Sequence, residues 1–115
     1  MTLEKSQSKK EEPKVEPKVV KLKLDPVKRD LIRRNILDAI QDNTINGVPI
    51  WDKMMGGHQK TLAMEAVAFH YSLPEVSAID SGDEWEFKFK YIVPGTEHEI
   101  LVSRKIGKGA LENAA

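Results

Sequence analysis

The chain alternates aromatic and charged residues in one stretch, which reads Trp85-Glu86-Phe87-Lys88-Phe89-Lys90-Tyr91-Ile92-Val93. Side chains of an extended strand point to opposite faces in turn, so the four rings share one face and the charges share the other. This pattern is typical of an antiparallel strand with one side on the core and the other in water. A core this small needs nearly all the available aromatic residues, so packing is favoured over base stacking.

The residues that follow predict a hairpin. Pro94-Gly95 suits the two central positions of a type II turn, because proline fixes the first φ and glycine accepts a positive second φ. Ile100, Val102 and Ile106 then alternate with other residues, which predicts a returning strand from His98 to Ile106. The apolar face of this hairpin needs a cover, and two upstream helices can supply it.

A first helix is expected from Asp25-Pro26 to about Asp42. Aspartate is a favourable N-cap, and proline is pre-set for the first helical position. The apolar stripe of this helix consists of Leu31, Ile32, Ile36, Ala39 and Ile40. Just before the helix, Val20, Leu22 and Leu24 alternate with two lysines and predict an exposed edge strand.

A second helix is expected from His58 to about Leu73, where Pro74 closes it. The connector before it, Val48–Met55, should contain a short helical turn. The apolar side of the second helix consists of Leu62, Ala66, Phe69 and Leu73. Three further residues widen this surface, so we expect this helix to be the more buried of the two: Ala63, Val67 and Ala68.

Together these elements predict a small single domain of the α+β class with the order β-α-α-β-β. Two helices pack on one face of an antiparallel sheet of two or three strands, over residues 20–106. Residues 1–19 are dominated by Lys, Glu, Pro and Ser, which cannot bury enough apolar surface to order, so we expect a disordered charged tail. Residues 107–115 are expected to be a flexible tail for want of a packing partner.

Composition excludes several classes of site. The 115 residues contain no cysteine, which excludes a disulfide scaffold, a thiolate zinc site, an iron–sulfur cluster and a cysteine nucleophile. Eighteen basic and eighteen acidic residues balance, so net charge indicates no particular partner. No apolar run approaches the roughly 20 residues of a membrane span, and the first residues lack the apolar core of a secretory signal. We therefore expect a cytoplasmic protein that does not insert into membranes.

Catalytic and cofactor sites are not indicated. The histidines, His58, His70 and His98, lack the spacing of a helical metal site. The segment Gly56–Thr61 resembles a phosphate-binding loop only superficially, because Gln59 stands where that loop needs glycine. No serine lies in a nucleophile elbow. The sequence therefore predicts a protein that is not an enzyme and uses no cofactor.

Basic residues crowd the boundary between the tail and the first helix, and they offer one candidate site for phosphate groups. The candidate nucleic-acid residues are Lys21, Lys23, Lys28, Arg29, Arg33 and Arg34. Five lysines precede them in the chain, diluted by glutamates: Lys5, Lys9, Lys10, Lys14 and Lys18. Because these charges do not form one helical stripe, a solvated surface is the simpler interpretation.

The connector provides the other candidate site. Trp51, Met54 and Met55 lie together, and tryptophan and methionine are enriched at adaptable protein interfaces. The alternative is that these residues close an open end of the core.

From these observations we expect a small non-enzymatic protein-interaction module, an accessory, assembly or regulatory factor. A nucleic-acid-binding module using the basic arm and first helix is the second hypothesis. The sequence indicates neither the partner's identity nor the oligomeric state.

Overall fold

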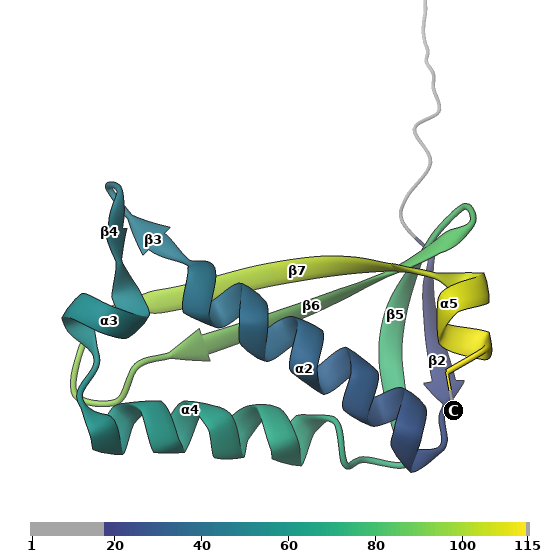
Figure 1. Ribbon diagram of the computed structural model, residues 1–115, viewed down its shortest axis with the longest axis horizontal. Coiled ribbons are helices and arrows are strands. Elements are labelled where there is room, and N and C mark those ends of the chain that lie inside the picture. The colour runs from purple at the N-terminus through teal and green to yellow at the C-terminus, as the bar shows by residue number, and fades with distance from the viewer. Residues whose placement is uncertain (1–17, 115) are drawn as a thin grey trace, which may run out of the picture.

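The computed structural model describes residues 18–114 (Figure 1). Most of the tail expected at residues 1–19, with Lys5, Lys9, Lys10 and Lys14, lies outside this range. The elements in chain order are β2 (Val19–Lys23), α2 (Pro26–Asp42), β3 (Thr44–Ile45), β4 (Val48–Pro49), α3 (Ile50–Met54), α4 (Gly57–His70), β5 (Glu75–Ser81), β6 (Glu84–Ile92), β7 (Glu99–Gly107) and α5 (Lys108–Glu112). The described residues thus mix helices and strands, as the α+β prediction requires.

The main sheet has four antiparallel strands in the order β2-β5-β6-β7. The prediction of two or three strands is therefore wrong, and β5 is the strand that was missed. Its inward side chains, Val76 and Ala78, are buried, but one of them is small and Pro74 stands directly before the strand. The periodicity of β5 was therefore too weak to indicate a strand.

The predicted hairpin is confirmed. Strands β6 and β7 pair along their whole length, with Phe87 opposite Arg104 and Phe89 opposite Val102. The Thr96 N–H donates to the Val93 carbonyl at 3.1 Å, and Gly95 between them has a φ of 81°. A residue with a side chain is strained at that φ, so glycine is what closes this turn.

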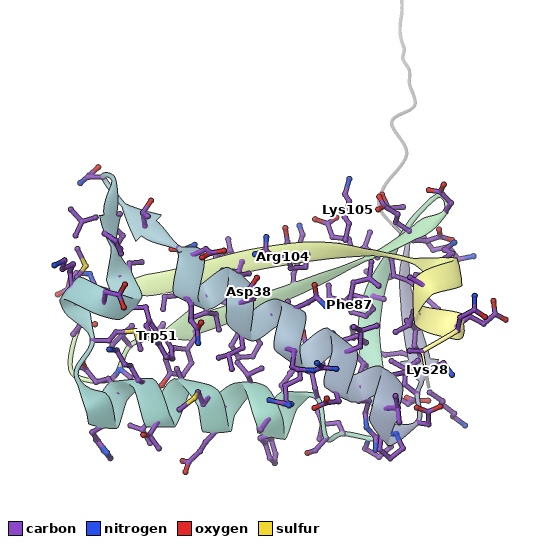
Figure 2. The ribbon with its side chains drawn as sticks, in the orientation of Figure 1. Lys28, Asp38, Trp51, Phe87, Arg104 and Lys105 are labelled. Carbon is purple, nitrogen blue, oxygen red and sulfur yellow. The ribbon has the colours of Figure 1, made fainter. Side chains whose placement is uncertain are left out.

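The core lies between the inner face of the sheet and α2, which crosses that face (Figure 1). Phe87 is completely buried, together with Ile32, Ile36 and Ile40 of α2. Figure 2 shows Phe87 close to the crossing of α2 over the sheet. The aromatic face of β6 is therefore an interior face, as its alternation predicts.

Helix α2 begins as its sequence predicts. The Asp25 carboxylate accepts a hydrogen bond from the Lys28 backbone N–H at 2.9 Å, and Pro26 occupies the first helical position. This bond satisfies one of the backbone donors that a helix start leaves without a partner.

Replacing Asp25 with alanine should therefore lower the free energy of unfolding by about 1 kcal/mol. Asp25→Asn is the matched control, because an asparagine side chain still caps the helix while the carboxylate charge is lost. Urea denaturation should rank the proteins wild type, Asp25→Asn, Asp25→Ala. Equal losses in both variants would contradict the capping role.

Helix α4 differs from its prediction in length and in burial. It ends at His70 rather than at Leu73, and only Ala63 and Val67 among its residues are buried. The expectation that this helix is more buried than α2 is wrong, because α2 buries four residues, three of them isoleucines. Ala63 and Val67 of α4 lie in the core, while Met64 and Phe69 of the same helix are exposed.

Two further elements were not predicted. Asn46 and Gly47, both with positive φ, form the turn of the small β3–β4 hairpin before α3. Helix α5 follows β7, and its Leu111 is only 3% exposed. The expectation that residues 107–115 have nothing to pack against is therefore wrong, since Leu111 belongs to the core.

Candidate functional site

The candidate residues of the connector lie on and just after α3, at one end of the core. Met55 is 6% exposed and belongs to the core, while Trp51 and Met54 are half-buried against it. The ammonium of Lys60 lies 5.8 Å from the centre of the Trp51 ring. Figure 2 labels Trp51 on α3. This placement favours the interpretation that the three residues close the end of the core, with only parts of Trp51 and Met54 accessible.

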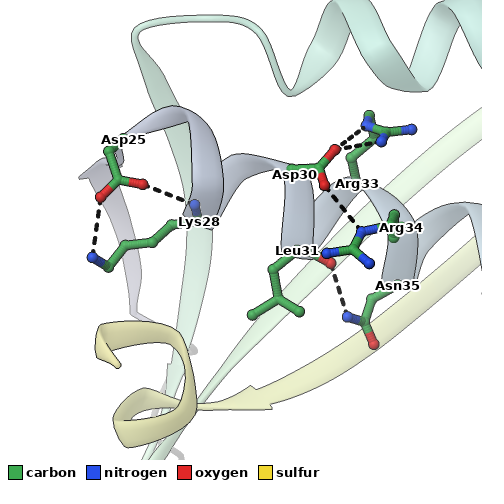
Figure 3. A network of polar contacts seen from close by, with 7 residues as sticks. All are labelled: Asp25, Lys28, Asp30, Leu31, Arg33, Arg34 and Asn35. Carbon is green, nitrogen blue, oxygen red and sulfur yellow. Dashed lines mark hydrogen bonds and ion pairs between the residues drawn. The ribbon is translucent and has the colours of Figure 1, made fainter. Parts of the chain in front are cut away.

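The basic residues of α2 are held by neighbouring groups of the chain (Figure 3). The Lys28 ammonium lies 3.2 Å from an Asp25 oxygen. Asp30 accepts from both Arg33 and Arg34, with the Arg34 Nε at 3.0 Å. Arg29 donates to the Leu24 carbonyl at 2.8 Å. All four cations are therefore already engaged within the domain.

The two carboxylates in this network stay ionised at neutral pH. The Lys28 backbone N–H and ammonium hold the pKa of Asp25 below its usual value. The Arg33 guanidinium does the same for the pKa of Asp30. Their negative charges therefore offset much of the positive charge that α2 would present to a phosphate backbone.

The other two candidate basic residues, Lys21 and Lys23, lie on the sheet and not on α2. Lys21 and Lys23 are exposed on β2, opposite Ser77 and Glu75 of β5, on the sheet face turned away from α2. The structure therefore divides the six basic residues between a strand and a helix and does not gather them into one patch.

An apolar surface emerges instead on α4. We call it the α4 stripe, and it consists of Leu62, Ala66, Phe69 and Leu73, the last just beyond the helix end. Phe69 is 70% exposed and Leu73 is 37% exposed, while Leu62 and Ala66 are half-buried. The sequence identified these four residues as one apolar side, but the assignment of that side to the core is wrong for its two outer members.

Helix α4 is fixed to the β6–β7 hairpin near both of its ends. At its start, the Gln59 amide donates to the Pro94 carbonyl at 2.8 Å and accepts from the Gly56 N–H at 2.9 Å. At its end, the His70 ring meets the Phe89 ring edge-on, with centroids 5.6 Å apart. Ala66 precedes His70 by one helical turn, so the α4 stripe runs beside these contacts with β6.

Burial lowers the pKa of His70, because its ring packs between Tyr71 and Phe89. Burial likewise raises the pKa of Tyr71. Both groups are therefore neutral at physiological pH and act as packing residues.

This sets a pH dependence for stability. The pKa of His70 is depressed below 6.5 in the folded state, so the unfolded state takes up a proton first as pH falls. The stabilisation is complete above about pH 6.5 and is lost progressively below it. Between about pH 7.5 and pH 5, the melting temperature of the wild type should fall further than that of His70→Gln. Parallel pH profiles for the two proteins would contradict this assignment.

A pocket of about 430 Å³ lies between β2, the start of α2, the start of β6 and α5. Its apolar lining comprises Leu22, Leu24, Trp85 and Leu111, with three lysines among the lining residues. The Lys108 ammonium lies 4.3 Å from the centre of the Trp85 ring and 2.7 Å from an Asp80 oxygen. Because these residues come from separate elements, no local pattern in the sequence indicated the pocket.

Within residues 18–114, no three His, Asp or Glu side chains are grouped closely enough to hold a metal ion. None of the helices in that range combines the length and apolarity needed to cross a bilayer. Compared with known proteins, the chain matches no family model, no curated protein and no solved structure. The geometry of the described residues is therefore the basis for the functional proposal.

Proposed function

We propose that this domain is a small non-enzymatic protein-interaction module, an accessory, assembly or regulatory factor whose partner binds the α4 stripe. The exposure of Phe69 carries the proposal. A phenylalanine side chain gains about 1.5–3 kcal/mol when it is buried, and this one lies on a helix beside two further exposed or half-buried leucines. Contiguous exposed apolar surface on a small domain is typical of a binding surface.

The occupant that fits is an apolar segment of a different polypeptide. From Leu62 to Leu73 the stripe extends over about 16 Å, at about 1.5 Å per residue. This length matches a short peptide segment of about five extended residues. The stripe is a raised helix side rather than an enclosed pocket, which suits a polypeptide better than a small molecule.

Binding of nucleic acid through the basic residues receives less support. Four of the six cations are engaged by carboxylates or by a backbone carbonyl, and the other two lie on the opposite face of the sheet. Counterion release needs several free cations on one surface, and the described residues of α2 do not offer them.

Site-specific cross-linking tests the proposal. With p-benzoylphenylalanine in place of Phe69, irradiation in an extract of the source organism should give one discrete cross-linked protein. Leu73→Asp in the same chain should remove the product, because a buried unpaired charge at the interface is strongly unfavourable. Leu101→Asp is the matched control, since Leu101 is also exposed (61%, against 37% for Leu73) but lies on the far face of the sheet, and it should leave the product unchanged.

Two results would contradict the proposal. One is a cross-link that survives Leu73→Asp. The other is the same product when the photo-reactive residue replaces Leu101 instead of Phe69.

A further inference from the structure

The hydrogen-bond pattern of β6 leaves one of its edges unpaired. Backbone groups of successive residues in an antiparallel strand point alternately to the two sides. The Val93 N–H donates to the His98 carbonyl at 3.0 Å, so Val93 and every second residue before it face β7. Ser81 and Glu84 pair across the two-residue turn at Gly82-Asp83. The backbone N–H and C=O groups of the even-numbered residues of β6 therefore point toward β5.

Strand β5 does not follow β6 along this side. Their pairing ends at Ile79 opposite Glu86, and the rest of β5 pairs with β2. In Figure 1 the two strands diverge from their common turn. The backbone groups of Lys88 and Lys90 therefore face no strand among residues 18–114, and their side chains are exposed. We call this stretch, Lys88–Ile92, the open edge of β6.

Helix α4 borders the open edge. Figure 1 shows α4 on the side of β6 opposite β7. The contacts of Gln59 with Pro94 and of His70 with Phe89 fix the helix there. Ala66 of the α4 stripe packs against the core, whereas Phe69 of the stripe is mostly exposed. A strand added to the open edge would therefore place alternate side chains toward Phe69, which is 70% exposed, and Leu73, which is 37% exposed.

The positive charge beside the open edge favours acidic residues at those positions of the added strand that do not face the α4 stripe. Lys88 and Lys90 lie on the outer face of the sheet. Lys90 has a carboxylate partner, Glu99, at 3.2 Å, whereas Lys88 has no ion pair within residues 18–114. Carboxylates opposite Lys88 are favourable, and like charges there are unfavourable.

We propose, building on the proposed function, that a segment of the partner binds to the open edge of β6, beneath the α4 stripe, as an added strand. In this segment apolar and acidic residues alternate. The backbone of Lys88 and Lys90 supplies the ladder, the α4 stripe receives the apolar side chains, and the two lysines receive the acidic ones. Such strand addition takes its affinity from main-chain hydrogen bonds and its specificity from the alternating side chains. The open edge spans about 16 Å, enough for about five residues.

The edge strand β2 of a second copy fits the site poorly. Edge strand β2 carries Lys21 and Lys23 on its outer face, so its addition to β6 would oppose lysine to lysine. The charge pattern therefore favours a different, acidic polypeptide.

The probe is the acetylated, amidated heptapeptide Glu-Val-Glu-Val-Glu-Val-Glu, titrated to about 1 mM into the ¹⁵N-labelled full chain and followed by NMR. Amide signals of Lys88 and Lys90 should shift and gain protection from hydrogen exchange, together with shifts at Phe69. Lys88→Glu should weaken binding about fivefold, and it should strengthen binding of the matched Lys-Val heptapeptide. A Glu-Val peptide with alternate N-methylated backbone amides should not bind, because it cannot form the ladder.

Three outcomes would overturn the inference. The first is the absence of shifts at Lys88 and Lys90 over the whole titration. The second is equal binding of the N-methylated peptide, which would keep the α4 stripe as a docking surface without strand addition. The third is a shift of the Lys88 and Lys90 signals on simple dilution of the protein, which would make a second copy the occupant. The cross-linking experiment at Phe69 tests the broader function independently of all three.

Discussion

Replacement of Phe87 by alanine is expected to lower the free energy of unfolding by about 3–5 kcal/mol, which is a large part of the stability of a small domain. Phe87 is completely buried where α2 crosses the sheet, among isoleucines that are themselves completely buried. Truncation removes the apolar surface of the ring and leaves a cavity that these branched side chains can fill only partly. Urea denaturation of the full chain measures the loss.

The matched control is the same substitution on the same chain at Phe69. Because that ring is mostly in water, Phe69→Ala should change the free energy of unfolding by less than about 0.5 kcal/mol. Phe87→Leu should fall between the two, since leucine refills part of the cavity. Similar losses for Phe87→Ala and Phe69→Ala would show that the aromatic face of β6 is not the centre of the core.

The hairpin could be predicted because its signals are local. Alternation from Trp85 to Tyr91 sets the buried face, and Pro94-Gly95 sets the turn. The same holds for the start of α2, where Asp25 and Pro26 are adjacent in the chain. Such patterns need no knowledge of what packs against them, so they remain valid in the folded domain.

Strand β5 and helix α5 could not be predicted for the opposite reason. The inward side chains Val76 and Ala78 give too little contrast, and β5 is recognisable only from its pairing with β2. Leu111 has few apolar neighbours in sequence, and its burial depends on elements far from it in the chain that meet beside Trp85. Tertiary context decides both elements.

The candidate site, too, could be predicted only in part from the sequence. Helical spacing grouped Leu62, Ala66 and Phe69 on one side of α4 and extended this side to Leu73, which lies beyond the helix end, but periodicity does not state what that side meets. Only the folded domain shows that Phe69 and Leu73 stay exposed on this side. The basic residues were likewise identified as charges, but their engagement by Asp25 and Asp30 depends on side-chain geometry in the folded helix.

Replacement of Leu111 by alanine is expected to cost about 2–5 kcal/mol, although the residue lies close to the end of the sequence. Its side chain is buried against the core and forms part of the wall of the Trp85 pocket. The loss should undock α5 and hydrate the Trp85 ring, because Lys108 of the same helix lies over that ring.

In a Trp51→Phe background, where Trp85 is the only tryptophan, its fluorescence should therefore shift to the red before global unfolding begins. Leu101→Ala is the matched control, since that leucine is exposed on β7, and it should leave both the denaturation midpoint and the Trp85 emission close to those of the parent. If Leu111→Ala behaved like Leu101→Ala, α5 would be a passive extension of β7. A lower denaturation midpoint together with a red-shifted Trp85 emission would instead show that α5 stabilises the end of the core through Leu111, a residue from the far end of the chain.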